Sequence, residues 1–240
     1  MNSYSALGNW FEYLNRDCDY SSWSQYLIER LRAFNAGRKG VDIGCGNGYF
    51  TRALYRAGYS VTGIDISPQM LNVAKQKSAE EGAPCEFLLG DITKLKLTGH
   101  VDFAVAINDC LNYVPPAKLK AAFSRVCACL NRGGVFHFDI SSQNKIKNVI
   151  ADNMFGEDGE DISYMWFNTP QPDGVTMDLT FFVRGADGRY DRFDETHRQY
   201  AHGEDDVISA LKAAGFSSVC TQGHLGTDDK TMRINFTAVK

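Results

Sequence analysis

The sequence lacks several features that would assign it to a specialised class. Its 240 residues include no apolar run of the roughly 18 residues that a membrane-spanning helix needs. The opening stretch Met1–Ser5 lacks the basic-then-apolar build of a secretory signal. The seven cysteines are scattered and form no C-x-x-C pair, and no H-E-x-x-H spacing occurs. We therefore expect a cytoplasmic protein with reduced thiols, no membrane segment and no metal site.

An excess of basic residues is also missing. Lys and Arg total 25 against 29 Asp and Glu, which gives a net charge of −4. Proteins that bind phosphate backbones through bulk electrostatics carry the opposite balance, so we expect no nucleic-acid partner. Apolar residues make up 44% and charged residues 22%, which indicates a globular chain with its own core. We expect a monomer or a homodimer.

Short apolar runs alternate with segments of helical periodicity over the first 140 residues. The expected strands are 39–43, 60–65, 85–89, 101–107 and 135–140. Helices are expected between them, for example after Ser67-Pro68, where serine can cap a helix and proline can open it. This alternation predicts an α/β fold, with a Rossmann-like parallel sheet and helices on both faces.

The pattern changes after Ile140. An acidic loop is expected at Glu157–Asp161, and residues 175–183 then alternate between apolar and polar, as in a strand with one wet face. Asp187-Gly188 is a hairpin-turn signal, after which residues 189–200 can return antiparallel. The chain is thus expected to have an N-terminal helical cap (1–35), a cofactor-binding α/β core (36–140), an antiparallel β insertion after the fifth strand (141–202), and a C-terminal helix with strands that complete the core (203–240).

A glycine-rich turn follows the first expected strand. Gly44, Gly46 and Gly48 alternate with other residues directly before a helix. Glycine permits a tight turn there and lets a ligand approach the backbone beside the free N–H groups of the helix start. A dinucleotide fingerprint would need glycine at Tyr49, and the carboxylate of Asp42 would repel a pyrophosphate. A nicotinamide dehydrogenase is therefore disfavoured, whereas a ligand with an ammonium group suits Asp42.

Two further acids follow the second and third expected strands. Asp65 lies 21 residues after Gly44, where it could accept hydrogen bonds from two ribose hydroxyls. Asp91 could accept a hydrogen bond from an adenine amino group. In open α/β sheets the ligand crevice lies at the carboxyl ends of the strands. Together with Asp42, these acids describe a nucleoside with an amino-acid tail and no phosphate.

These motifs resemble class I S-adenosylmethionine-dependent methyltransferases. The resemblance covers about residues 36–140, through the glycine turn, Asp65 and the Gly90-Asp91-Ile92 step. Further stretches look like a bacterial subgroup of small cytosolic methyltransferases: Tyr4-x-x-Leu7, Asp19-Tyr20, Trp23, residues 108–113, Asp194-Glu195-x-His197 and Arg233-Ile234-x-Phe236. More distantly, the layout is similar to sugar N,N-dimethyltransferases, which also carry an antiparallel insertion after the fifth strand.

One departure from this pattern lies near the N-terminus. The subgroup commonly has Tyr-Asp where this chain has Phe11-Glu12. In the sugar-modifying relatives a tyrosine around that place lies on the substrate side. Its hydroxyl is absent here, so that role is not carried over.

The resemblance implies S-adenosyl-L-methionine as cofactor and methyl transfer to a nitrogen or oxygen of a small polar acceptor. The residues expected at the cofactor are Tyr20, Asp42, Gly44, Gly46, Asp65, Ile66, Met70, Asp91, Ile92 and Asn108. On the acceptor side, Tyr113 aligns roughly with a histidine of the sugar-modifying enzymes. Asp139 is expected to face the pocket from the end of the fifth strand, whereas His137 on the same face is expected in the core. Tyr113 and Asp139 are the candidate catalytic residues.

Other interpretations stay open at this point. An RNA methyltransferase would keep the cofactor and change the acceptor, although the net charge weighs against it. A module that binds S-adenosylmethionine without transferring its methyl group would act as a sensor or a partner of another protein. His197, Arg198 and Tyr200 lie on the expected hairpin, which either roofs the acceptor or forms a solvated edge strand.

Overall fold

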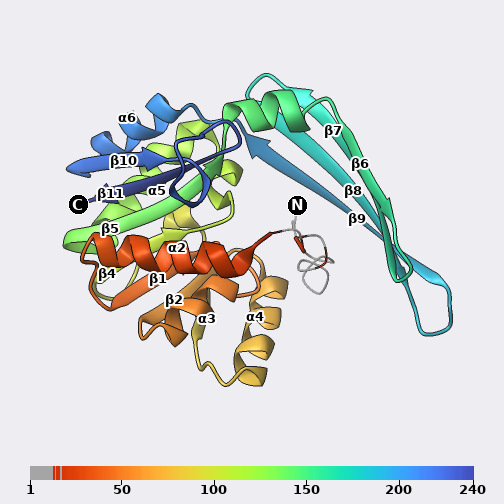
Figure 1. Ribbon diagram of the computed structural model, residues 1–240, viewed down its shortest axis with the longest axis horizontal. Helices are drawn as coiled ribbons and strands as arrows, with labels where there is room; N and C mark the ends of the chain where they lie inside the picture. Colours follow the sequence, from red (N-terminus) through yellow and green to blue (C-terminus); the bar gives the residue numbers. More distant parts are fainter. Residues whose placement is uncertain (1–12, 14, 17) are drawn as a thin grey trace.

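The structure is a computed structural model that describes residues 13, 15–16 and 18–240. Two sheets organise the described chain: a mixed sheet at the centre of the core, and an antiparallel sheet that projects from it as a curved arm (Figure 1). The elements are α2 (Tyr20–Ala33), β1 (Lys39–Ile43), α3 (Tyr49–Arg56), β2 (Ser60–Asp65), α4 (Pro68–Glu80), β3 (Glu86–Leu89), η2 (Ile92–Lys94), β4 (Val101–Ala106), η3 (Cys110–Tyr113), α5 (Pro116–Cys129), β5 (Leu130–Ser141), η4 (Lys145–Ile150), β6 (Met154–Asp158), β7 (Ile162–Gln171), β8 (Gly174–Arg184), β9 (Tyr190–Tyr200), α6 (Glu204–Ala214), β10 (Ser218–Gln222), η5 (His224–Gly226) and β11 (Arg233–Val239).

The core sheet has the strand order β10-β11-β5-β4-β1-β2-β3. Strands β1 to β5 are parallel, whereas β11 runs antiparallel to β5, and β10 runs antiparallel to β11. Strand β1 lies in the middle of the parallel strands. The chain first adds β2 and β3 on one side of β1 and then β4 and β5 on the other side, so β1 and β4 are neighbours. Ligands bind at such a reversal of strand order in open α/β sheets, because the loops after the two strands diverge there. The expected α/β sheet is confirmed.

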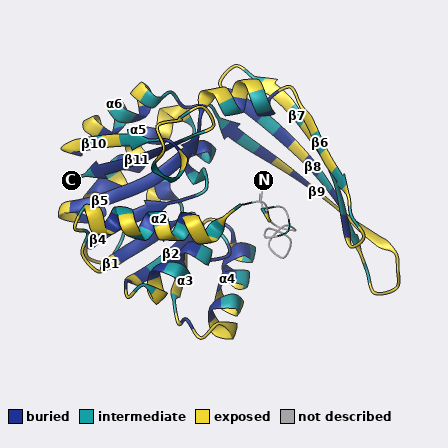
Figure 2. Ribbon diagram, in the orientation of Figure 1, coloured by how far each residue is buried: buried dark blue, intermediate teal, exposed yellow. Residues whose placement is uncertain are grey.

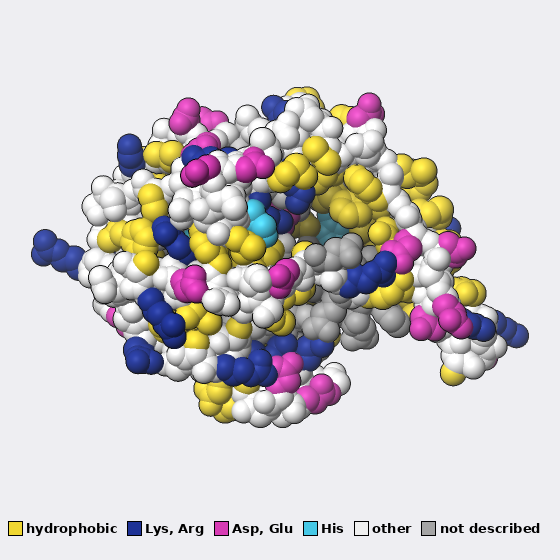
Figure 3. All heavy atoms as spheres, in the orientation of Figure 1, with side chains coloured by type: hydrophobic (Ala, Val, Ile, Leu, Met, Phe, Trp, Pro, Cys, Tyr) yellow, Lys and Arg dark blue, Asp and Glu magenta, His cyan; other side chains and the backbone are white. Residues whose placement is uncertain are grey.

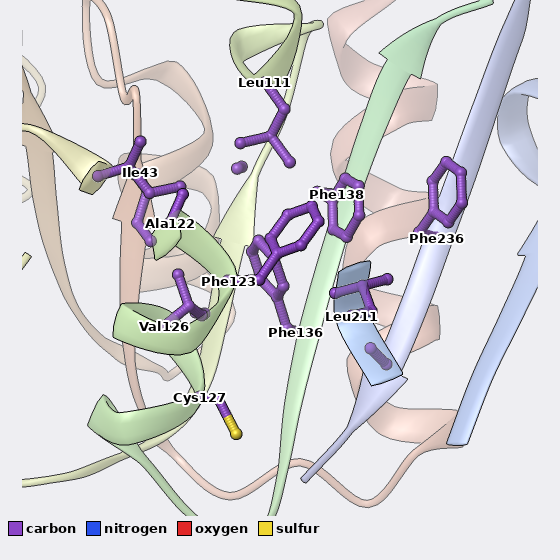
Figure 4. Close-up of a cluster of buried hydrophobic side chains, with 14 of the residues drawn as sticks. Ile43, Leu111, Ala122, Phe123, Val126, Cys127, Phe136, Phe138, Leu211 and Phe236 are labelled. Atoms are coloured by element: carbon purple, nitrogen blue, oxygen red, sulfur yellow. The ribbon is translucent and has the colours of Figure 1, made fainter. Parts of the chain in front are cut away.

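The two faces of the core sheet are covered by different helices. On one face Phe136 and Phe138 of β5 pack against Phe123 of α5 and Phe236 of β11 (Figure 4). On the other face α2 and α3 cover the alternate residues of the same strands, among them Val135. Figure 2 shows the strands of this sheet dark with burial between the two layers of helices. Apolar side chains on both faces explain the near-continuous apolar runs of these strands.

The antiparallel sheet follows β5 in the chain and has the order β6-β7-β8-β9. The expected insertion after the fifth strand is therefore present, with its turn at Gly188, whose φ is 81°. The expectation of an acidic loop at Glu157–Asp161 is partly wrong, since Glu157 and Asp158 are paired with β7 in strand β6. Because β6 is an edge strand, charged side chains on it can remain in contact with solvent. No helix of the described residues is long and apolar enough to span a membrane.

Candidate active site

The glycine turn after β1 forms a cradle at the carboxyl edge of the sheet. Gly44, Gly46 and Gly48 have φ values of 70°, 54° and 77°, which side chains with a Cβ rarely adopt. The N–H groups of Gly44 and Cys45 donate to the carbonyl of Ile64 at 2.7 and 3.1 Å, so the turn is anchored to β2. A Cβ on Gly44 would lie 2.2 Å from Sγ of Cys110. The backbone of the turn is therefore held close to the loop after β4.

Asp42 lies directly beneath this cradle. Its side chain is fully buried, and its Oδ2 accepts a hydrogen bond from the Thr51 hydroxyl at 2.6 Å. Burial raises the pKa of the Asp42 carboxyl to about 7, which the hydrogen bond from Thr51 only partly offsets. Arg52, also buried, supports the turn from α3 by donating to the carbonyl of Asn47 at 2.6 Å. The contact of Asp42 with a ligand ammonium group stays a prediction.

Asp65 joins the cradle to the end of β2. Its Oδ2 accepts the N–H of Gly46 and its Oδ1 accepts the N–H of Ser67, both at 2.8 Å. Burial raises the pKa of this carboxyl, and the two backbone hydrogen bonds oppose that rise. A carboxylate has about four acceptor positions, so hydroxyl donors can still bind to it. The position suits the predicted binding of two ribose hydroxyls.

The other residues predicted at the cofactor fall into two groups. Ile66 is 67% exposed although it follows a buried strand, and it offers an apolar surface beside Asp65 that a flat ring could cover. Met70 is buried, with its Cε near the position that a Cβ on Gly46 would take. Ile92 is buried in the core, so its side chain supports the site from behind rather than lining it.

Asp91 and Tyr20 flank the cradle. Asp91 caps η2, because its Oδ1 accepts hydrogen bonds from both the N–H and the hydroxyl of Thr93 at 2.8 Å. Tyr20 opens α2, and its ring packs 4.8 Å from that of Tyr49, the first residue of α3. Both residues thus lie next to the elements that form the cradle. Their contacts with the cofactor stay predictions.

A strained turn follows β4. Asn108 and Asp109 have φ values of 64° and 50°, in the left-handed region that is unfavourable for both. Asp139, at the end of β5, compensates this strain. Its Oδ1 accepts the N–H of Asn108 at 2.7 Å, and its Oδ2 accepts the N–H of Asp109 at 2.9 Å. Asp139 is thus committed to the backbone of this turn, and the contact of Asn108 with the cofactor stays a prediction.

Arg233, from the antiparallel strand β11, completes this corner. Its guanidinium forms ion pairs with Asp139 and, at 3.4 Å, with Oδ1 of Asp109, and it lies 4.7 Å from the ring centroid of Trp23. The expectation that Asp139 faces the pocket as a catalytic base is wrong. Its carboxyl is fully buried and already accepts three partners, so it has no access to an acceptor.

Asp109 is the carboxylate of this corner that reaches toward the antiparallel sheet. Its Oδ2 accepts a hydrogen bond from the side-chain amide of Gln199 on β9 at 2.7 Å. Burial raises the pKa of the Asp109 carboxyl, but Arg233, Lys145 and Gln199 outweigh it, so the net shift is downward. Asn112 adds a second bridge, since its amide donates to the carbonyls of Ser141 and Tyr200. The antiparallel sheet is therefore fastened to the loop after β4.

Glu195, His197 and Gln199 line the inner face of β9. They alternate with exposed or half-buried residues, and their register partners on β8 are Leu179, Met177 and Val175. Nε2 of His197 lies 3.1 Å from Oε2 of Glu195, and Oη of Tyr113 lies 3.5 Å from Nδ1 of His197. Figure 3 shows the molecule hollowed between the core and this sheet. The sequence left two interpretations of this hairpin, a roof over the acceptor or a solvated edge strand. The burial of His197 agrees with a roof, whereas Arg198 and Tyr200 are half-buried.

Several of these residues were not predicted as site residues, although Asp109, Glu195 and Arg233 lie in stretches that resemble the methyltransferase subgroup. The missed group comprises Thr51, Arg52, Asp109, Glu195, Gln199 and, as a partner of Asp139, Arg233. The sequence does contain a signal for three members of this inner face. Polar residues at every second position, 195, 197 and 199, share one face of a strand, and their partners on the neighbouring strand are apolar. A polar strand face beside apolar neighbours indicates the lining of a site. Phe11 and Glu12 lie outside the described residues. The described part of the chain contains no cluster of three or more His, Cys, Asp or Glu residues that could hold a metal ion.

Comparisons with known proteins agree with this geometry. A family model described as a methyltransferase domain matches residues 41–134. A protein of Geobacillus sp. (strain WCH70) that is named a methyltransferase is 33% identical over 222 residues, which are 90% of this chain and 89% of that protein. The crystal structure of a S-adenosylmethionine-dependent methyltransferase from Clostridium acetobutylicum ATCC 824 has a TM-score of 0.90, 30% identity and 98% coverage of each chain.

The fold and the cradle define a class I methyltransferase. The chain belongs to the family of S-adenosylmethionine-dependent methyltransferases, and its cofactor is S-adenosylmethionine. The sugar N-methyltransferase KedS8 from Streptoalloteichus sp ATCC 53650 has a TM-score of 0.80 over 95% of this chain and 90% of that chain. At 19% identity this likeness shows the fold alone.

Proposed function

We propose that the protein methylates a nitrogen or oxygen atom of a small polar acceptor bound between the core and the antiparallel sheet. The observation that carries this proposal is the polar inner face of β9, which is fastened to the loop after β4 through Gln199 and Asp109 at 2.7 Å. That loop lies beside the glycine cradle, since Cys110 contacts Gly44. A site covered in this way favours a small molecule over a folded macromolecule. The sugar N-methyltransferase with the same layout supports this choice.

The residues of the cradle would hold the cofactor. Bound S-adenosylmethionine supplies a methyl carbon that its sulfonium already activates. Asp42 would meet the ammonium group of the methionine, Asp65 the ribose and Asp91 the adenine, with Ile66 against the ring. The exposed apolar side chain of Ile66 beside the carboxylate of Asp65 fits a nucleoside, because it offers one apolar and one polar contact.

The chain's main contribution to the reaction is orientation. In favourable cases, orientation can supply about 7 to 11 kcal/mol of the barrier. The antiparallel sheet would exclude water from the acceptor, and Asp109 and Tyr113 would position it from the end of β4. An amine or hydroxyl acceptor must also lose a proton, which requires a base within hydrogen-bond reach.

The test has two stages. Calorimetric titration with S-adenosylhomocysteine, with NAD as control, should give micromolar binding of the first ligand and none of the second. Labelled S-adenosylmethionine is then offered with panels of amino sugars, free and nucleotide-linked, of phenols and of transfer RNA. Label in an amine or a phenol supports the proposal. Label in RNA alone, or tight cofactor binding with no label in any panel, would contradict it in favour of an RNA methyltransferase or a binding module.

A further inference from the structure

Glu195 and His197 form a buried, charge-capable pair on the inner face of β9. The side chains are 1% and 4% exposed, and Nε2 of His197 lies 3.1 Å from Oε2 of Glu195. Their register partners on β8, Leu179 and Met177, are apolar. Removing a carboxylate and an imidazole from water carries a desolvation cost that an apolar pair at these positions would avoid. Packing alone therefore does not explain why these two side chains are buried on β9.

Tyr113 connects this pair to the core. It ends η3, directly after β4, and its Oη lies 3.5 Å from Nδ1 of His197. The two rings meet edge-on, with centroids 6.0 Å apart at 72°. Tyr113 is half-buried, so part of its ring is accessible. Glu195, His197 and Tyr113 thus form a continuous chain from the antiparallel sheet to the end of β4.

We propose that Glu195, His197 and Tyr113 form a relay that removes the acceptor's proton, which rests on the proposed function above. With its ring proton on Nε2, His197 donates to Glu195 and presents Nδ1 as an acceptor to Tyr113. The lone pair of the acceptor nitrogen or oxygen forms the bond to the methyl carbon, while the electrons of the carbon–sulfur bond remain on sulfur. The acceptor's proton passes to Oη of Tyr113, and the hydroxyl proton of Tyr113 passes to Nδ1 of His197. The resulting imidazolium is stabilised by the carboxylate of Glu195.

The carboxylates of the neighbouring corner suit this task less well. Asp139 is enclosed by the two backbone N–H groups of the turn and by Arg233. Asp109 accepts the amide of Gln199 and is paired with Arg233, so its remaining acceptor positions can orient the acceptor, but the ion pair makes it a weak base. An imidazole ordinarily titrates near pH 6.5, which makes it a better proton acceptor at neutral pH than a carboxylate.

Several described residues face His197. From its own strand it faces Glu195, and from η3 it faces the phenol of Tyr113. Its partner on β8 is the uncharged Met177. Gln199, the next residue on the same face, is neutral and leads to Asp109 and Arg233. Among these residues, Glu195 provides the carboxylate that Nε2 of His197 meets.

The first experiment reads the ring directly and needs no acceptor. The full chain is labelled with ¹⁵N-histidine and saturated with S-adenosylhomocysteine, and the resonance absent from His197→Gln is assigned to His197 among the five histidines. We expect the tautomer with the proton on Nε2. In Glu195→Gln the share of the tautomer with the proton on Nε2 should fall, because the amide oxygen is a weaker acceptor for that proton than the carboxylate. A proton on Nδ1 in the parent, or a tautomer that does not respond to Glu195→Gln, would overturn the relay.

The second experiment uses the acceptor found in the panel. His197→Gln should lower kcat about 10²-fold or more, remove the acid limb of the kcat–pH profile, and leave the affinity for S-adenosylhomocysteine unchanged. Tyr113→Phe should lose the same limb. His137→Gln is the control, since His137 is equally buried but bonds Thr237 beneath α2. It should keep the profile of the parent.

The two proposals fail in different ways. If His197→Gln and Tyr113→Phe keep the kcat and the acid limb of the parent, the relay is wrong and the protein is still a methyltransferase. If the parent methylates nothing, the proposed function fails, and the nuclear magnetic resonance experiment still decides whether Glu195 controls His197. Unfolding temperatures are measured for every variant. Tyr113→Phe removes one hydroxyl from a half-buried ring, so it remains informative if the variants of the buried pair unfold.

Discussion

The backbone N–H of Gly46 donates a hydrogen bond of 2.8 Å to Oδ2 of Asp65, which fastens the turn after β1 to the acid at the end of β2. The other oxygen of Asp65 accepts the N–H of Ser67, which caps α4 through its own hydroxyl. One carboxylate therefore shapes the glycine cradle, positions the start of α4 and offers its remaining lone pairs to a ligand. The shape of the cradle and the binding of a ribose depend on the same side chain.

Replacing Asp65 by Ala should weaken the binding of S-adenosylhomocysteine by about 1.5 to 3 kcal/mol, because charge-assisted hydrogen bonds are lost. That range corresponds to roughly 10- to 150-fold in the dissociation constant, which calorimetry resolves. Asp178→Ala is the matched control, since Asp178 is exposed on β8 and accepts a hydrogen bond from the Thr196 hydroxyl. It should bind as the parent does. Unchanged affinity of Asp65→Ala would show that the ribose is held elsewhere.

A second prediction separates backbone strain from steric exclusion at the cradle. Gly44 and Gly82 have similar φ values, 70° and 61°, but a Cβ on Gly44 would lie 2.2 Å from Sγ of Cys110, whereas a Cβ on Gly82 meets nothing within 4 Å. Gly82→Ala should lower the free energy of unfolding by about 1 to 2 kcal/mol through the left-handed backbone alone. Gly44→Ala should cost more and should also lose cofactor affinity. Urea unfolding compares the two.

Equal losses in the two alanine variants would mean that Cys110 can move aside. Cys110→Ala in the Gly44→Ala background tests this further. It removes the sulfur and should recover part of the stability. The strain of the backbone would remain, so full recovery would contradict the assignment.

The cofactor half of the site could be predicted from the sequence because its signals are local. The glycine turn and Asp65 each follow a strand that the apolar pattern marks clearly, and β1 and β2 fall where they were expected. The strand β7 escaped prediction for a physical reason. It carries large apolar side chains on both faces, with Met165 and Phe167 exposed, and it contains Pro170. Proline is tolerated there because β6 pairs only with residues 163–167, so at Pro170 strand β7 is paired with β8 alone and its other side is an edge.

The acceptor half could not be predicted in the same way, because its residues meet only through the fold. Tyr113 and His197 are 84 residues apart in the chain, and Arg233 is 94 residues from Asp139. Asp139 was expected to face the pocket from the end of β5. The antiparallel pairing of β11 with β5 brings Arg233 beside it instead, and no pattern near Asp139 indicates that partner.

The pairing of Arg233 with two carboxylates leads to a third prediction. Arg233→Met keeps the apolar stem near Trp23 but leaves Asp139 without its ion pair and Asp109 with Lys145 alone, so the variant should lose about 3 to 5 kcal/mol of stability. Adding Asp139→Asn should restore part of this loss, since a buried negative charge is removed. Urea unfolding of the two single variants and the double variant gives the coupling energy. Additive losses would mean that Arg233 and Asp139 contribute independently.

Asp42 gives a prediction in pH. Burial raises the pKa of its carboxyl from 3.8 to about 7 in the folded chain. The unfolded chain therefore releases this proton first as the pH rises, and the residue lowers the stability of the free protein progressively between about pH 4 and pH 7. The change in pKa corresponds to an upper figure of roughly 4 kcal/mol. Asp42→Asn cannot ionise, so the variant should unfold at a higher temperature than the parent at pH 8 and at a similar temperature near pH 4.

The same titration should appear in ligand binding. An ammonium group beside Asp42 favours the ionised carboxylate, so binding of S-adenosylhomocysteine to the parent should release a proton near pH 7 and weaken toward pH 6. Calorimetry in two buffers of different ionisation enthalpy measures that proton, and Asp42→Asn should release less and bind more weakly. The difference between parent and variant reports Asp42 together with Asp65, whose charge interacts with it. If the variant is less stable than the parent at pH 8, burial does not raise the pKa of Asp42 in the free protein, and the hydrogen bond from Thr51 outweighs its desolvation.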